Sequence, residues 1–169
     1  TPIKSSAASD VYKRQIYMLE VGTKAMHFQL YDDKHNLVSL DMFKGKKIVL
    51  YFYPKDNTSG CSSQAVHFKH IYDKLTELKV VLIGISKDSI QSHQNFISKY
   101  QLPFTLLSDP SLQVIKDYDV WHEKKLYGKT YMGTVRTTYI IDESGYIIYA
   151  KENVNPSQNP NDVLNFLLK

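Results

Sequence analysis

The sequence contains a single residue that could serve as a strong nucleophile at neutral pH. Cys61 is the only cysteine among 169 residues. It follows a polar loop, residues 56–60, and precedes a stretch with helical spacing of apolar residues. Unpaired N–H groups and the helix dipole favour a thiolate at a helix start, so the pKa of such a cysteine is expected to be lowered. The alternative is a small buried apolar residue that happens to begin a helix.

Two elements must hold this thiol in place. Residues 48–53 form an unbroken apolar run that stops at Pro54, a pattern typical of a strand buried on both faces. At about 100° per residue, Cys61 lies within roughly 20° of Phe68 around the following helix, which predicts that the thiol points toward the sheet. The apolar residues of this helix recur three or four apart; they are Ala65, Phe68, Ile71, Tyr72, Leu75 and Leu78.

The residues around the thiol also resemble a known family. The pattern Pro54-x-x-x-Thr58-x-x-Cys61 is similar to the active-site motif of the peroxiredoxins, which are thiol peroxidases with a thioredoxin-like fold. The segments VLYFYPKDNTSGC and YGKTYMG-x-x-R-x-T-x-x-ID-x-x-G resemble the bacterioferritin comigratory protein, or PrxQ, branch. Two residues depart from that pattern. Ser59 replaces the usual proline, and Val66 stands where many members carry a second cysteine.

The resemblance implies a role for each residue of the motif. Cys61 would attack a peroxide oxygen and become a sulfenic acid. Thr58 would orient the peroxide or donate to its distal oxygen, together with backbone N–H groups near the thiol. Pro54 would remove a backbone donor and cover the thiol, and Arg136 would hold the thiolate in its charged form. Taken singly, Pro54 could simply end a strand, Thr58 could cap a helix, and Arg136 could be a solvated strand residue.

Three further residues are expected to contribute to the substrate site. Gly60 lets the backbone approach closely. Gln64 is suited either to an N-terminal capping role or to a hydrogen bond with Arg136. Trp121 is expected to pack in a loop near the site, where it could form a wall for the substrate.

Two other functions stay open for a thiol at this place. One is a monothiol exchange protein, because Cys61-Ser-Ser-Gln64 sits where thioredoxins place C-x-x-C; the other is a catalytically silent thioredoxin-like binding module. Pro54 and Thr58 favour the peroxidase, since thiol exchange requires neither. His67 and His70 could form half of a metal site, but a solvated pair explains them better, and we predict no metal and no cofactor.

Composition excludes several classes of partner. A net charge of +4 without a clustered basic stripe gives no case for nucleic acid. One cysteine cannot form an intrachain disulfide, no apolar run approaches the roughly 20 residues that span a bilayer, and no secretory signal is evident. We therefore expect a cytoplasmic protein that does not bind membranes. The 43% hydrophobic content suits one domain with a sizeable core.

The order of elements predicts an α/β sandwich, a thioredoxin-like fold with a central mixed sheet flanked by helices. Residues 1–17 are polar and are expected to be a disordered or non-native tail, with a single domain over residues 18–169. The predicted elements are an N-terminal β-hairpin (26–30 and 37–40), strands at 48–53, 80–86 and 104–107, helices at 61–79, 89–100, 111–118 and 161–169, a loop at 120–134, and a hairpin (137–141 and 146–150). Asp109 is the expected N-cap of the helix at 111–118, with Pro110 at its first position.

The cycle of a one-cysteine peroxidase needs a partner. A sulfenic acid must be reduced by a thiol, and this chain offers no second one. Besides its hydroperoxide substrate, the protein is therefore expected to use an external thiol, such as thioredoxin, glutaredoxin or glutathione. It is expected to act as a monomer, with a weak dimer as the alternative.

Overall fold

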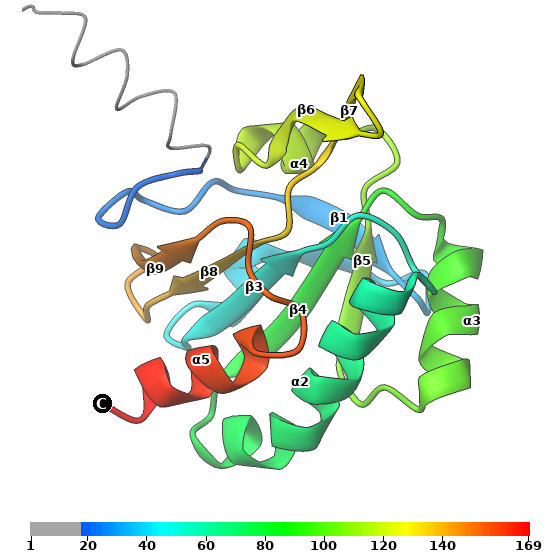
Figure 1. Cartoon of the computed structure of the whole chain (residues 1–169). Helices are drawn as coiled ribbons and strands as arrows, with labels where there is room; N and C mark the ends of the chain where they lie inside the picture. Colours follow the sequence, from blue (N-terminus) through cyan, green and yellow to red (C-terminus); the bar gives the residue numbers. More distant parts are fainter. Residues whose placement is uncertain (1–17) are drawn as a thin grey trace, which may run out of the picture.

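The computed structural model describes residues 18–169, and the predicted tail lies outside the described residues. A seven-stranded mixed sheet of order β2-β1-β5-β4-β3-β8-β9 forms the centre of the molecule (Figure 1). Strands β3, β4 and β5 pair in parallel, and the other neighbours pair antiparallel. The strands are β1 Gln29–Asp32, β2 Leu37–Ser39, β3 Ile48–Phe52, β4 Val81–Ser86, β5 Thr105–Ser108, β8 Thr137–Ile141 and β9 Ile147–Lys151.

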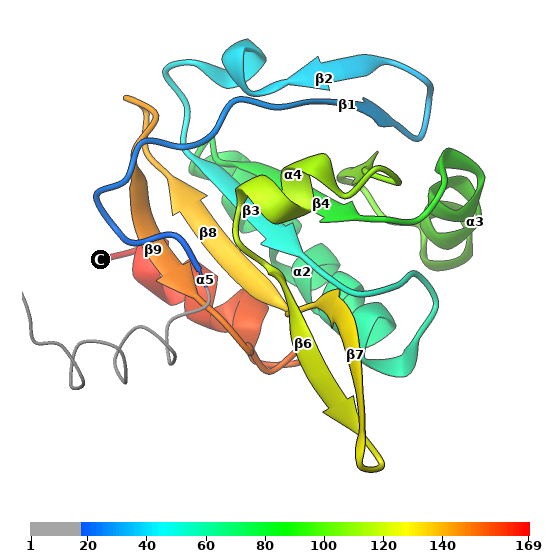
Figure 2. The same ribbon diagram turned by 90° about the horizontal axis from the view of Figure 1, so that it is seen from above.

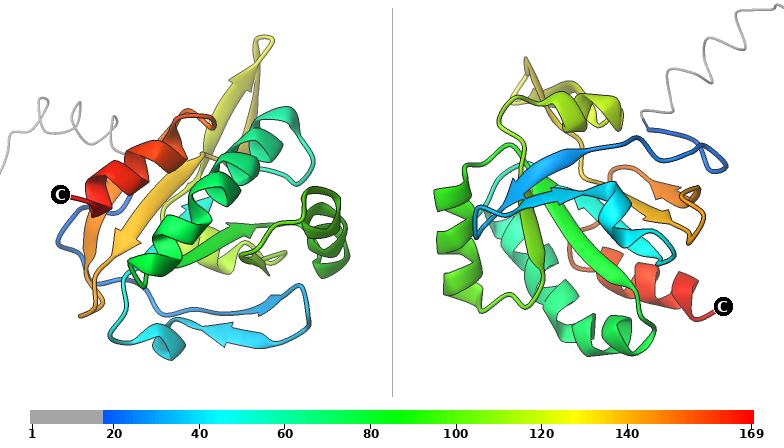
Figure 3. Two further views of the ribbon diagram at one scale, coloured as in Figure 1. Left: turned by 90° about the horizontal axis from the view of Figure 1, so that it is seen from below. Right: turned by 180° about the vertical axis from the view of Figure 1, so that it is seen from behind.

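Helices cover both faces of this sheet, as predicted. Helices α2, α3 and α5 pack on one face, where α2 and α5 lie side by side, and α4 packs on the other (Figure 3). The helices are α2 Ser59–Glu77, α3 Ile90–Tyr100, α4 Gln113–Asp117 and α5 Asn159–Leu167, with a short 3-10 helix, η1, at Leu40–Phe43. Among the described residues, no helix is both long and apolar enough to cross a bilayer.

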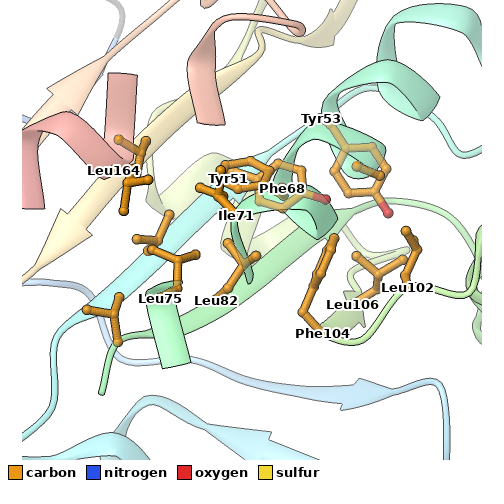
Figure 4. Close-up of a cluster of buried hydrophobic side chains, with 14 of the residues drawn as sticks. Tyr51, Tyr53, Phe68, Ile71, Leu75, Leu82, Leu102, Phe104, Leu106 and Leu164 are labelled. Atoms are coloured by element: carbon orange, nitrogen blue, oxygen red, sulfur yellow. The ribbon is translucent and has the colours of Figure 1, made fainter. Parts of the chain in front are cut away.

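Strand β3 is the structural axis of the fold because both of its faces are covered. Successive side chains of a strand point to opposite sides, and every residue of β3 is buried. Val49 and Tyr51 enter the core under α2 and α5. Figure 4 shows Tyr51 in this core beside Phe68 of α2. Leu50 and Phe52 enter the second core, under α4. Burial on both faces explains why the sequence of β3 is continuously apolar. It also fixes the position of the loop that follows the strand.

The N-terminal strands lie near the residues predicted for a hairpin. Strands β1 and β2 pair antiparallel, with Leu30 opposite Val38. Strand β1 also pairs antiparallel with β5 through Tyr31 and Asp32. The two N-terminal strands therefore extend the edge of the central sheet.

The prediction of a loop over residues 120–134 is wrong. The segment forms a two-stranded antiparallel hairpin, β6 Trp121–Leu126 and β7 Lys129–Thr134, which projects from the body of the molecule (Figure 2). Tyr127 and Gly128 connect the strands with positive φ angles of 52° and 76°, the conformation of a tight two-residue hairpin turn. The segment lacks an apolar face and the usual Asn-Gly signal, so its sequence does not stand out from a polar loop.

Helix α4 is shorter than predicted, and its start differs. The helix begins at Gln113, and Leu112 occupies the N-cap position in a left-handed conformation with φ of 67°. Asp109 is not the N-cap, but its Oδ2 accepts a hydrogen bond of 2.8 Å from the Ile115 N–H, further into the helix. The last helix also begins earlier than predicted, with Pro160 in its first turn.

Candidate active site

Cys61 lies in the first turn of α2 and shares a buried cluster with side chains of β3. Thr58 is the N-cap residue, with the extended backbone usual for that position. Cys61 is only 2% exposed and belongs to the same buried cluster as Tyr51 and Phe68. The predicted orientation of the thiol toward the sheet is therefore confirmed, and the sulfur lies at the positive end of a 19-residue helix.

Arg136 reaches the sulfur from a distant part of the chain. Its Nη2 donates to Cys61 Sγ at 3.4 Å, and its Nη1 donates to Gln64 Oε1 at 2.7 Å. Arg136 lies in the short link between β7 and β8, and its carbonyl accepts from the Val154 N–H at 3.1 Å. The backbone of Arg136 is thus fixed by Val154. Its guanidinium donates from one nitrogen to the thiol and from the other to the side-chain amide oxygen of Gln64, about one helical turn after Cys61.

Gln64 connects this arginine to a buried polar chain. Gln64 Nε2 donates to Asn159 Oδ1 at 3.0 Å, and Thr138 Oγ1 donates to the same oxygen at 3.0 Å. Gln64, Thr138 and Asn159 are almost completely buried. Of the two roles expected for Gln64, the structure shows the hydrogen bond to Arg136, and it places the amide behind the guanidinium. Asn159 and Thr138 carry no recognisable signal in the sequence, because their contacts depend on how α5 packs on β8.

Gly60 leaves room for the close approach of the arginine. A Cβ atom at this position would lie 3.1 Å from Arg136 Nη2 and 3.7 Å from Pro156 Cγ. The absent side chain therefore leaves the space in which the guanidinium reaches the sulfur. The expectation that Gly60 permits a close approach has this physical basis, although the approaching group is a side chain.

Thr58 and Pro54 lie in the loop between β3 and α2, which leads to the thiol. Thr58 is exposed, and its Oγ1 donates to the Lys55 carbonyl oxygen at 3.1 Å. Its side chain makes no capping hydrogen bond, although the residue is at the N-cap. Pro54 lies two residues after the end of β3 and is half-buried.

The sequence predicts a loop at Trp121, but the structure places this residue in a strand. It is the first residue of β6 and packs against the core under α4, whereas Cys61 belongs to the core on the opposite face of the sheet. The indole therefore helps to anchor the projecting hairpin.

The structure adds two ionisable neighbours that the sequence did not reveal. Tyr51 is buried, and its hydroxyl has no hydrogen-bond partner among the described residues. Burial raises the pKa of this hydroxyl well above its usual value, nearby Cys61 adds to the shift, and Arg136 opposes it. Lys124 Nζ donates to the Thr134 carbonyl at 2.9 Å, and burial followed by repulsion from Arg136 lowers the pKa of the ammonium. The surroundings of the sulfur thus combine a neutral phenol with two cations.

This arrangement defines a class of protein. A central strand leads through a short loop to a buried cysteine at the start of a long helix, and an arginine from a distant segment donates to the sulfur. Such a site brings a cationic donor to the sulfur and leaves first-turn N–H groups without intrahelical partners, free to donate to a bound oxygen. These are the requirements of a thiol-based oxidoreductase on a thioredoxin-like fold.

Known proteins identify the family. Residues 21–150 match the AhpC/TSA family, and the chain belongs to that family. It is 50% identical over 129 residues to a putative peroxiredoxin bcp of Coxiella burnetii, a match that covers 76% of this chain and 85% of the relative. It is 45% identical over 130 residues to the peroxiredoxin Bcp of Bacillus subtilis, covering 77% of this chain and 83% of the relative.

Solved structures agree with this assignment. A crystal structure of a mutant of Xylella fastidiosa PrxQ superimposes with a TM-score of 0.84 at 30% identity, covering 89% of this chain and 96% of that one. The bacterioferritin comigratory protein of Xanthomonas campestris gives a TM-score of 0.79 at 30% identity, with 83% and 90% covered. The predicted thioredoxin-like fold and the resemblance to the Bcp/PrxQ peroxiredoxins are therefore confirmed. The protein is a thiol peroxidase that uses a peroxide substrate and a thiol reductant.

Proposed function

We propose that Cys61 is the nucleophile that reduces hydrogen peroxide and small organic hydroperoxides. The Cys61 thiolate attacks the terminal peroxide oxygen, the O–O bond breaks, and the departing oxygen takes up a proton and leaves as water or an alcohol. The products at the protein are a sulfenic acid and a vacant substrate site. The observation that carries this proposal is the 3.4 Å contact between Arg136 Nη2 and Cys61 Sγ, because it puts a permanent cation against the reacting sulfur.

The oxygen atoms of the peroxide need donors on the loop side of the thiol. We assign this role to the Thr58 hydroxyl and to the N–H groups in the first turn of α2. The hydroxyl donates to the Lys55 carbonyl in the structure, so it would exchange that partner for the peroxide. Pro54 borders the same loop and would shield the thiol from water. Gln64 acts indirectly, since it orients Arg136.

Both classes of peroxide fit this chemistry. The attack needs only a terminal O–O group, and the alkyl part of an organic hydroperoxide stays on the leaving oxygen. The Xanthomonas campestris relative has a structure whose title names alkyl peroxide reduction activity, which supports organic hydroperoxides as substrates here.

We propose that an external thiol completes the cycle. The incoming thiol attacks the sulfenic acid, releases water and forms a mixed disulfide; a second thiol then frees Cys61 and leaves as part of a disulfide. Thioredoxin, glutaredoxin and glutathione supply such thiols. The chain is expected to act as a monomer in the cytoplasm, where thiols are kept reduced.

With Val66 in α2, no disulfide within the chain can form at this position, so the catalytic cycle does not require the helix to unwind. Val66 lies within α2, where many relatives of this branch carry a second cysteine. Five residues along an intact helix separate Cα atoms by about 8.7 Å, from the rise and radius of the helix. Disulfides require roughly 4.4 to 6.8 Å, so a cysteine at this position would have to unwind the first turns. With Val66, we expect α2 to stay folded after oxidation.

The central experiment compares oxidation of Cys61 by hydrogen peroxide with oxidation of free cysteine, under pseudo-first-order conditions. We expect the protein thiol to react several orders of magnitude faster, and Cys61→Ser to be inactive. A rate no higher than that of free cysteine would sink the proposal. The same assay with tert-butyl hydroperoxide tests the organic substrates.

The recycling step has its own measurement. Mass spectrometry after one equivalent of peroxide should show sulfenic acid on monomeric protein, or an adduct with added glutathione. Rapid and quantitative formation of a Cys61–Cys61 dimer would mean that two subunits resolve each other. Val66→Cys provides the converse test, since an intrachain disulfide should form in this variant only as far as the helix can unwind.

A further inference from the structure

A buried polar cluster lies directly behind the loop that carries the thiol. Its centre is Asp56, a loop residue that is only 5% exposed. Asp56 Oδ1 accepts a hydrogen bond of 2.6 Å from the Tyr53 hydroxyl. Asp56 Oδ2 lies 2.8 Å from Ser92 Oγ, which donates to it, and 2.7 Å from His93 Nδ1. An acidic side chain in the middle of the active-site loop is thus turned inward and surrounded by donors.

His93 connects the cluster to the central sheet. The imidazole is fully buried, and its Nε2 lies 3.0 Å from the carbonyl oxygen of Leu107 in β5. Both ring nitrogens therefore face oxygen acceptors. Both ring nitrogens of His93 and both carboxyl oxygens of Asp56 therefore have hydrogen-bonding partners, which is the condition for burying such polar groups.

The backbone of the loop is fastened at the same place. The Asp56 N–H donates to Asp88 Oδ2 at 2.9 Å, and Ser86 Oγ donates to the same oxygen at 2.6 Å. Asn57 follows with a left-handed backbone, φ of 62°, which non-glycine residues adopt only at some cost. The next residue is Thr58, the N-cap of α2. The cluster therefore fixes the turn at Asn57. The proposed oxygen donors, the Thr58 hydroxyl and the first N–H groups of α2, directly follow this turn.

The composition of this cluster is also that of a divalent-metal site. Donor atoms of Asp56, Asp88 and His93 lie within 4.8 Å of one another. However, the nearest carboxylate oxygens already accept N–H and O–H groups, and His93 Nδ1 is in direct contact with Asp56 Oδ2. The donor atoms are saturated by hydrogen bonds within the protein, so the geometry favours a clamp over a metal centre.

We propose that Asp56 and His93 are positioning residues for peroxide reduction: together they fix the loop of residues 54–58, and with it the Thr58 hydroxyl and the first-turn N–H groups above Cys61. This inference rests on the proposed function of the site. The titratable groups facing the pair are Tyr53, the residue directly after β3, and Asp88, from the loop after β4. Burial raises the pKa of Tyr53 well above its usual value, and the Asp56 charge adds to the shift, so the phenol remains a donor to the carboxylate.

The test separates positioning from general stability by using two reactions of the same thiol. Peroxide reduction needs the oxygen donors of the loop, whereas alkylation by iodoacetamide needs only the thiolate. Asp56→Asn keeps the side-chain volume but replaces one of the two carboxyl oxygens with an NH2 group. A single oxygen then remains for the hydrogen bonds that Asp56 makes with Tyr53, Ser92 and His93. We expect peroxide oxidation to slow by about tenfold or more, while alkylation stays within about twofold of wild type.

Asp109→Asn is the matched control. Asp109 is another buried aspartate, but its carboxylate serves the backbone of α4 through the Ile115 N–H. This variant should lower the melting temperature without changing the ratio of the two rates. A folded Asp56→Asn protein with the wild-type ratio would overturn the clamp. Absence of fast peroxide oxidation in the wild type would instead overturn the proposed function, so the two failures are distinguishable.

Two milder variants keep the inference testable if Asp56→Asn does not fold. Tyr53→Phe and Ser92→Ala each remove one donor to Asp56 and leave the pair with His93 intact. Each should lower the ratio of peroxide oxidation to alkylation by a few-fold, about two to four, since one of several bonds is lost. An unchanged ratio in both would overturn the clamp.

Discussion

The two sides of Cys61 are built in different ways. On the Arg136 side, the guanidinium, the Gln64 amide and Asn159 form a hydrogen-bonded chain between α2, α5 and β8; Gln64 and Asn159 are buried, and Arg136 is half-buried. On the Thr58 side, a short loop leads into the helix that carries the thiol, and the hydroxyl of the exposed Thr58 donates to a carbonyl of the same loop. The partners of Arg136 are thus part of the core, whereas Thr58 lies in a turn that is anchored to the core through Asp56.

This difference separates two requirements of the reaction. In the proposed mechanism, the Arg136 side acts on the sulfur through buried hydrogen bonds, which are strong because the surroundings are poorly polarisable and the partners are fixed. The loop side is proposed to supply the donors to the peroxide oxygens, so it would exchange a hydrogen bond when substrate binds. We therefore expect changes on the buried side to impair every reaction of the thiol, and changes on the loop side to impair peroxide reduction selectively.

Arg136→Met should have the largest effect. The variant keeps an apolar stem but removes the donor to Cys61 Sγ and the partner of Gln64. Peroxide oxidation should slow by about tenfold or more, which corresponds to roughly 1.4 kcal/mol or more of transition-state stabilisation. Stopped-flow measurements with hydrogen peroxide provide the rate, and iodoacetamide alkylation should slow as well.

Arg136→Lys is its matched control. The ammonium keeps the charge but cannot present two parallel donors to Cys61 and Gln64, so an intermediate rate is expected. Equal rates for Arg136→Met and wild type would contradict the assigned role of the arginine.

Thr58→Val should come next, with an effect confined to one reaction. The variant removes the proposed donor to the peroxide oxygen at nearly constant volume. We expect peroxide oxidation to slow by about fivefold, roughly 1 kcal/mol, with alkylation unchanged. Thr58→Ser retains the hydroxyl and should stay near wild type. If Thr58→Val slows both reactions equally, the loop side is not selective and the contrast between the two sides fails.

Asn159→Ala should affect stability more than rate. The change leaves Gln64 Nε2 and Thr138 Oγ1 without their common acceptor inside the core. The free energy of unfolding should fall by about 1–3 kcal/mol. The peroxide rate should fall by only about threefold, because Arg136 still contacts the sulfur. Urea denaturation and the stopped-flow rate together check this, and a loss of activity as large as that of Arg136→Met would place Asn159 closer to the chemistry than the structure suggests.

Gly60→Ala should have the smallest effect on the rate. The added methyl would lie 3.1 Å from Arg136 Nη2, so the guanidinium has to shift by a few tenths of an ångström. We expect about a twofold loss in both the peroxide and the alkylation rates, as for a weakened contact on the buried side. A selective loss of peroxide oxidation would show that Gly60 belongs functionally to the loop.

Much of the fold could be predicted because its signals are local. The apolar run of β3 reports burial on both faces, and the helical period of α2 places Cys61 toward the sheet. The β6–β7 hairpin was missed for the converse reason. Its strands are largely exposed and carry lysines, so no apolar alternation distinguishes them from a loop. The turn at Tyr127 and Gly128 relies on backbone angles that this residue pair only weakly suggests.

The thiol and its helix start could likewise be found from neighbouring residues alone, because the dipole and the free N–H groups follow from the position of Cys61 in the chain. The partners of the site could not. Gln64 and Asn159 are 95 residues apart, and Asp56 and His93 are 37 apart, and each pair meets only because helices pack on particular strands. Arg136 was recognised through a family motif, but its hold on the sulfur depends on the space at Gly60 and on the amide behind it. Periodicity along the chain determines which face of an element is buried; which polar side chains then meet across the core is decided by tertiary packing, where each buried donor must find an acceptor.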